Sequence, residues 1–130
     1  MMTSAEDAIE KAAFDLLSAV ADLGAPVYQH VPENTPPPVV IIGDIETVPI
    51  GGKDDPDRRA TLSVMTVTEA EERKSLLQIK GKAEAALDGA QAEHDGWTLS
   101  FAFIAATAVL TAEGDGYVGE SRFQILALRA

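Results

Sequence analysis

The chain has 130 residues, with 10 basic against 21 acidic side chains and a net charge of −11. This length predicts a single domain over residues 1–130, and the acidic balance argues against a protein that grips DNA phosphates or an anionic membrane surface. The absence of cysteine excludes disulfides, zinc–thiolate sites and a thiol nucleophile.

The first predicted element is an amphipathic helix. Thr3 is placed to cap it, and Glu6 is spaced to complete a capping box. Gly24 and Pro26 are typical of the end of a helix. One apolar stripe recurs at helical spacing and comprises Ile9, Ala13, Leu16, Val20 and Leu23.

Three strands are predicted next. Residues 27–31 form a short strand, and a proline-rich loop over residues 33–38 separates it from a β-branched strand over residues 39–50. Residues 51–58 carry turn and charge residues without an apolar side chain and predict an exposed, mobile loop. Residues 59–68 alternate in character and predict the third strand.

A second helix is predicted over residues 69–87, with Gly81 inside it as a sign of close packing on a neighbour. Residues 97–111 and 117–128 then form a long hairpin around a glycine-containing turn. The predicted order is therefore α-β-β-β-α-β-β. The corresponding fold class is α+β, a two-layer sandwich of two helices on a largely antiparallel five-stranded sheet.

Motifs for chemistry are weak or missing. His30 and His94 stand alone, without a nucleophile or metal ligand at motif spacing. Gly51-Gly52-Lys53 resembles a phosphate loop, but Thr47 and Asp54 occupy positions where that motif needs glycine and Ser or Thr. Three aspartates, at positions 54, 55 and 57, lack the spacing of a calcium loop. The sequence therefore assigns no catalytic, cofactor-binding or metal-binding residue.

Four stretches in order resemble the tail completion, or tail terminator, family of tailed phages, prophages and gene transfer agents. The resemblance departs from the family at Thr66-Val67-Thr68, where an aromatic residue is common. The four stretches are Val27–Pro32, Pro38–Gly43, Ala60–Val67 followed by a helix with Arg73 near its start and Ala86-Leu87 near its end, and Asp115–Gly119 with Arg122–Leu128.

The resemblance implies a structural virion protein rather than an enzyme. Its place is the virion tail, assembled in the bacterial host cytoplasm. It implies a ring of identical subunits, by family analogy a hexamer, that caps the tail tube, stops its polymerisation and offers the head-proximal joining surface. The implied partners are other copies, the tail tube protein and the neck proteins. DNA passes through the lumen without specific binding, and no membrane is involved.

Contact residues are expected in two exposed turns: Lys53, Asp54, Asp55, Asp57 and Arg58 in the first, and Glu113 and Asp115 in the hairpin tip. Two alternatives stay open. One is a head–tail connector subunit of the neck. The other, from a different class, is a small ligand-binding or enzymatic α+β domain that uses His30.

Overall fold

The computed structural model describes residues 3–52, 54–69, 73–111 and 114–129. None of the helices in these ranges is long and apolar enough to cross a membrane. The elements in chain order are α1 (Ala5–Ser18), β1 (Val27–Tyr28), β2 (Val39–Pro49), β3 (Arg58–Glu69), α2 (Arg73–Leu87), β4 (Gln91–His94), β5 (Trp97–Leu110) and β6 (Gly116–Arg129).

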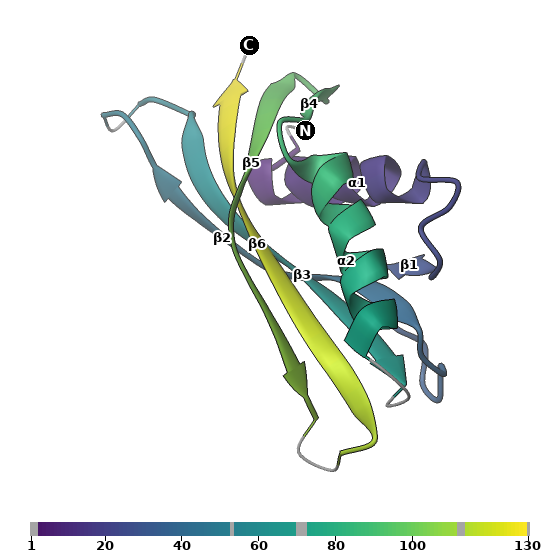
Figure 1. The fold of residues 1–130 in the computed structure, drawn as a ribbon. Coiled ribbons are helices and arrows are strands. Elements are labelled where there is room, and N and C mark those ends of the chain that lie inside the picture. The colour runs from purple at the N-terminus through teal and green to yellow at the C-terminus, as the bar shows by residue number, and fades with distance from the viewer. Residues whose placement is uncertain (1–2, 53, 70–72, 112–113, 130) are drawn as a thin grey trace.

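The sheet corrects the predicted architecture. It has six strands in the order β1-β2-β3-β6-β5-β4, with β1 parallel to β2 and the other pairs antiparallel. The prediction of a two-layer sandwich with a largely antiparallel five-stranded sheet was therefore wrong, and the sheet curves into a half-barrel around the helices (Figure 1). Two bulges, at Ile42/Ile45 in β2 and Phe103/Ala105 in β5, contribute to this curvature because an extra residue bends its strand.

Both helices lie on one face of the sheet, and the other face is uncovered (Figure 1). Buried side chains alternate along β3 and β6, with Leu62, Val64, Phe123 and Ile125 pointing to the helices. The alternate side chains of β3 and β6, together with those of β2 beside them, form what we call the open face, which includes Asp44, Glu46, Arg59, Thr61, Ser63, Glu120, Arg122, Gln124, Leu126 and Leu128.

The start of α1 differs from the prediction by one residue. Ser4 caps the helix, and its hydroxyl accepts a hydrogen bond from the Asp7 backbone N–H at 3.1 Å. Thr3 instead ties the chain to the sheet. Its hydroxyl donates to Asp95 Oδ2 at 2.6 Å, and its carbonyl accepts from Trp97 Nε1 at 2.8 Å. The N-terminal residues therefore anchor α1 to the β4–β5 hairpin.

A buried ion pair fixes α2 on β6. Lys80 Nζ lies 2.6 Å from Glu84 Oε2, and the same oxygen accepts from the Ser121 hydroxyl at 2.6 Å. The Lys80 stem crosses the sheet above Gly119, where an added Cβ would stand 2.7 Å from Lys80 Cδ. Gly81, in contrast, has no atom of the described structure within 4 Å of an added Cβ, so the expected close packing does not occur within the chain.

Two glycine substitutions should therefore act in opposite directions. Gly119→Ala should lower the free energy of unfolding by about 1–3 kcal/mol, because the methyl group overpacks the buried Lys80 stem. Gly81→Ala should raise it by about 0.5–1 kcal/mol, since alanine is the better helix former in open space. Urea denaturation of the two variants measures both changes, and equal shifts would contradict the packing described for Gly119.

Candidate functional site

Exposed apolar side chains gather on the second half of β5. Residues 102–110 of this strand, which we call the β5 arm, contain no charged residue. Phe103, Ile104, Val109 and Leu110 are exposed by 39% to 54%. Large apolar residues in contiguous exposed groups mark interaction sites on soluble proteins. The β5 arm is therefore the leading candidate for a contact surface.

The β5 arm is also a free sheet edge. On its outer side β5 pairs with β4 only as far as Ser100. Phe101 then exchanges backbone hydrogen bonds with Gly89 and Ala90, and the Phe103 N–H donates to Asp88 Oδ1 at 3.0 Å. Beyond Phe103, no strand within the described ranges lies on the outer side of β5. The backbone groups of the arm that point outward are thus available to another chain.

The base of the β5 arm is rigidly placed. Phe103 packs edge-on against the buried Phe123 ring, with centroids 5.9 Å apart and an interplanar angle of 70°. Leu99 and Phe101 just before it are buried in the core. The bulge at Phe103/Ala105 follows this anchor and re-aims the strand. The arm therefore leaves the core in a fixed direction and runs beside β6 beyond the helices (Figure 1).

The predicted contact residues of the first turn have partners within the chain. Asp55 Oδ1 accepts from the Asp57 N–H at 2.9 Å, and Asp57 Oδ1 accepts from the Arg129 N–H of β6 at 2.8 Å. Arg58 Nη1 donates to the carbonyls of Asp55 and Asp57. Asp54 is exposed, and Lys53 lies outside the described residues. These bonds pin residues 55–58 to the sheet, and their contact with partners stays a prediction.

The structural role of Asp57 makes a separate prediction. Asp57→Ala should reduce the free energy of unfolding by about 1–2 kcal/mol, because the partly buried Arg129 N–H loses its acceptor. Asp54→Ala should change it by less than about 0.5 kcal/mol, since that side chain is exposed. Thermal or urea unfolding of both variants tests this difference, and a loss for Asp54→Ala as large as that for Asp57→Ala would refute it.

The described residues on the two sides of the hairpin tip are joined by hydrogen bonds. Asp115 Oδ1 accepts from the Thr111 hydroxyl at 2.8 Å, and Gly114 has a φ of +73°, which glycine adopts without strain. Asp115 is exposed, and Glu113 lies outside the described residues. These bonds hold residues 111 and 114–116 together at the far end of the β5 arm, and contact of Asp115 with a partner stays a prediction.

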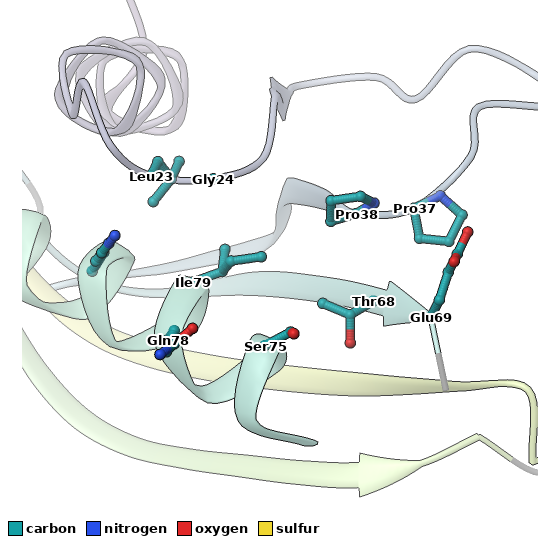
Figure 2. Close-up of a pocket in the computed structure, with 10 residues that line it drawn as sticks. Leu23, Gly24, Pro37, Pro38, Thr68, Glu69, Ser75, Gln78 and Ile79 are labelled. Carbon is teal, nitrogen blue, oxygen red and sulfur yellow. The ribbon is translucent and has the colours of Figure 1, made fainter. Parts of the chain in front are cut away.

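A cavity of about 410 Å³ lies between α2, the end of β3 and the segments on either side of β1 (Figure 2). Among the described residues that line it, Glu69 is acidic and Lys82 is basic, and Lys82 Nζ is 3.4 Å from Asp22 Oδ2. No histidine is among the described residues that line it. The lining residues are Leu23, Gly24, Pro37, Pro38, Thr68, Glu69, Ser75, Gln78, Ile79 and Lys82.

The two histidines lie apart from this cavity. His30 is exposed in the segment after β1, and His94 ends β4 with its Nε2 3.6 Å from Asp95 Oδ2. In the part of the chain that the structure describes, no three His, Asp or Glu side chains are grouped to hold a metal ion. Among the described residues, His30 therefore lies outside both the cavity and any group of metal-ligating side chains.

Known proteins share the fold and the sequence pattern of this chain. No curated protein sequence matches the chain. A solved chain from the virion of a native gene transfer agent (GTA) particle superposes with a TM-score of 0.82, covering 92% of this chain and 94% of that one. At 18% identity this likeness shows a shared fold. The family model for tail completion protein gp17 matches residues 7–127, nearly the whole sequence, and the chain therefore belongs to the tail completion protein gp17 family.

Proposed function

We propose that this protein closes the end of a tail tube as a ring of identical copies, ending tube polymerisation and presenting the surface that joins the head. Family membership already makes it a structural protein of the phage-type virion tail. The number of copies, the capping step and the tube and neck partners are the proposal. Its role is assembly by surface complementarity rather than catalysis.

The observation that carries the proposal is the β5 arm. An uncharged edge strand with exposed apolar side chains is a template for pairing and a hazard for a free monomer. Soluble proteins protect such edges with charges, prolines or a covering element, and the arm has none of these among the described residues. A head-to-tail contact made through this edge generates a ring when its rotation closes.

The two ends of the molecule suit two different partners. The segment 51–58 lies at the end of the sheet that holds Arg129, because Asp57 binds Arg129 there. The tip at Asp115 lies at the opposite end of β6 (Figure 1). The 14 residues of β6 separate these ends by about 45 Å at a rise of roughly 3.3 Å per residue. A ring of aligned copies would thus offer one end to the tube and the other to the neck.

The open face supports a lumen through which DNA slides. It carries the carboxylates of Asp44, Glu46 and Glu120 against the guanidinium groups of Arg59 and Arg122. Six copies at −11 each would carry a net charge of −66. A lumen with an excess of carboxylates repels phosphates and leaves DNA unbound.

The same charge predicts that salt assists ring formation. Subunits of net charge −11 repel each other, and raising the ionic strength from about 0.01 M to 0.15 M shortens the screening length from about 30 Å to 8 Å. The ring fraction in analytical ultracentrifugation should therefore rise over this range. A steady fall with added salt would show that attractive charge pairs dominate the contact and would contradict this prediction.

The proposal itself is tested by removing the gene from its phage or prophage. Capped tails have a controlled length, so particles without the cap should have overlong or headless tails in electron micrographs. Supplying the wild-type protein in trans should restore normal particles. Tails of normal length with attached heads in the deletion strain would disprove the capping function, and normal-length tails without heads would favour the neck connector instead.

A further inference from the structure

We infer that the β5 arm pairs, in antiparallel register, with the free edge of β2 in a second copy of this chain. The inference rests on the proposed ring and names the surface that closes it. It makes the sheet of one copy continuous with the sheet of the next. Both edges have unpaired backbone groups, their strand directions are compatible, and their side chains are complementary.

The β2 edge is the counterpart of the β5 arm at the other side of the sheet. β1 covers β2 only at Val40 and Ile41. From residue 43 to residue 49 no strand in the described part of the chain lies on the outer side of β2. Val48 lies near the end of this edge and Ile50 just after it. Their side chains are exposed by 52% and 40%. Exposed large apolar residues therefore occur at both free edges.

The strand directions allow the two edges to meet without reversing the sheet. The four long strands β2, β3, β6 and β5 alternate in direction, because each neighbouring pair is antiparallel. An even number of alternating strands leaves β5 antiparallel to the β2 of a copy placed next in the same orientation. Rotation about a ring axis therefore continues the antiparallel pattern from one copy to the next.

One register sets side chains of the same sheet face opposite each other and also pairs the whole length of the arm beyond the bulge. A one-residue slip would turn each side chain to the opposite face, so side chains of the helix-covered face must meet their equivalents. Among the registers that keep this rule, one pairs all six residues from 105 to 110 with residues 43 to 48. The pairs are Ala105 with Val48, Ala106 with Thr47, Thr107 with Glu46, Ala108 with Ile45, Val109 with Asp44 and Leu110 with Gly43.

The paired side chains are complementary in size and charge. Small residues of the arm face larger ones of β2, as Ala108 faces Ile45, and Leu110 faces a glycine. Thr107 can donate its hydroxyl to the Glu46 carboxylate, and no pair joins two like charges. Pairing of β2 with β2 would instead bring Asp44 and Glu46 of two copies together. Pairing of β5 with β5 would close a two-fold dimer and leave both β2 edges free.

The register also gives the stagger that a closed barrel needs. Within one copy, Ile45 is level with Phe103, through Leu62 and Phe123. In the inferred contact, Ile45 of the second copy is level with Ala108. Each copy is thus shifted along the strand direction relative to its neighbour, and the shift has the same sense at every contact. Strands of a closed sheet must tilt and stagger in this way.

Cysteine cross-linking tests the inferred register, and the natural sequence has no cysteine to interfere. Ala105→Cys and Val48→Cys place thiols on two exposed residues that the register sets opposite each other. Directly opposed Cβ atoms lie about 4.5–5.5 Å apart, close to disulfide geometry. The matched control combines Ala105→Cys with Asp44→Cys, where the four-residue offset separates the thiols by roughly 13 Å. Circular dichroism first verifies that each variant is folded.

The two single variants are mixed at the salt concentration that gives the most rings, and are then oxidised with copper phenanthroline. We expect the Ala105→Cys and Val48→Cys mixture to form a disulfide dimer at least about tenfold faster than the control mixture, because only its thiols reach bonding distance. The double variant should form a ladder of cross-linked chains that ends at the ring. Rapid self-linking of Ala105→Cys alone would show β5–β5 pairing and overturn the inference.

Electron microscopy of the same samples separates this inference from the proposed function. Rings without the expected cross-link would overturn the β5–β2 register and leave the ring itself standing. Neither rings nor cross-links, with wild-type protein also remaining monomeric when tail tubes are added, would count against both. Cross-links together with rings would support both.

Discussion

Replacing Ala106 by lysine should prevent ring formation while the subunit stays folded. Ala106 is exposed in the free chain and lies in the middle of the β5 arm. In the inferred contact its side chain faces Thr47 and the start of α1 in the next copy, so the bulk of a lysine side chain would overpack the contact and hold the two strands apart. We expect association to weaken by at least about tenfold, or 1.4 kcal/mol per contact, when measured by analytical ultracentrifugation.

The charge change of this variant makes the expected result more informative. Lysine lowers the net negative charge of the subunit, and this change alone would ease the repulsion between copies. A loss of assembly must therefore come from the local contact. Gln124→Lys is the matched control, because it adds the same charge at an exposed position of the open face on the central strand β6. Equal weakening by both variants would contradict an interface at the β5 arm.

Periodicity predicted most of the regular elements. The stripe of the first helix and the alternation in β3 and β6 correspond to buried faces in the structure, with Ile9, Leu62 and Phe123 fully buried. The helix itself ends at Ser18, so Val20 and Leu23 of the predicted stripe lie beyond it. These patterns succeed because each element buries one side against the same core. The second helix begins at Arg73 in the structure, and Glu69 belongs to β3. Its acidic residues at positions 71 and 72 lie outside the described residues.

β4 shows where periodicity fails, and β1, predicted over residues 27–31, shows where it does not set the length or the pairing of a strand. β4, with the sequence Gln-Ala-Glu-His, pairs with β5 at the sheet edge and buries none of its side chains fully, so it carries no apolar signal. β1 contains only two residues, and its parallel pairing with β2 depends on the path of the preceding loop. Both strands form because neighbouring backbone offers hydrogen-bonding partners. Such pairing is set by tertiary structure rather than by local side chains.

The alternation of apolar residues that identified the core did not identify the β5 arm as a contact surface. In the sequence, Trp97, Leu99, Phe101 and Phe103 alternate and predict one buried face, which the first three confirm. Beyond Phe103 the strand stays apolar, but α2 lies over β3 and β6 and no helix covers the β5 arm (Figure 1). An apolar run that would be read as core is therefore exposed, and sequence alone could not separate a core strand from an interface strand.

A stable subunit is needed to hold this arm in place, and Glu84 is central to that stability. Its carboxylate accepts from both Lys80 and Ser121, and the Lys80 side chain is only 8% exposed. Glu84→Ala would leave the buried ammonium group and the Ser121 hydroxyl without this acceptor. We expect the free energy of unfolding to fall by about 3–5 kcal/mol, measured as a lower urea midpoint at an unchanged slope.

An exposed ion pair of the same spacing provides the control. Lys11 and Asp15 are also four residues apart on a helix, but their side chains are 49% and 57% exposed. Asp15→Ala should cost less than about 0.5 kcal/mol, because water already solvates both charges. Replacing Lys80 by Met and Glu84 by Leu together should recover most of the loss, since no buried charge then lacks a partner. A cost below about 1 kcal/mol for Glu84→Ala would mean that water reaches Lys80 in solution, and that the Lys80–Glu84–Ser121 contact does not hold α2 on β6.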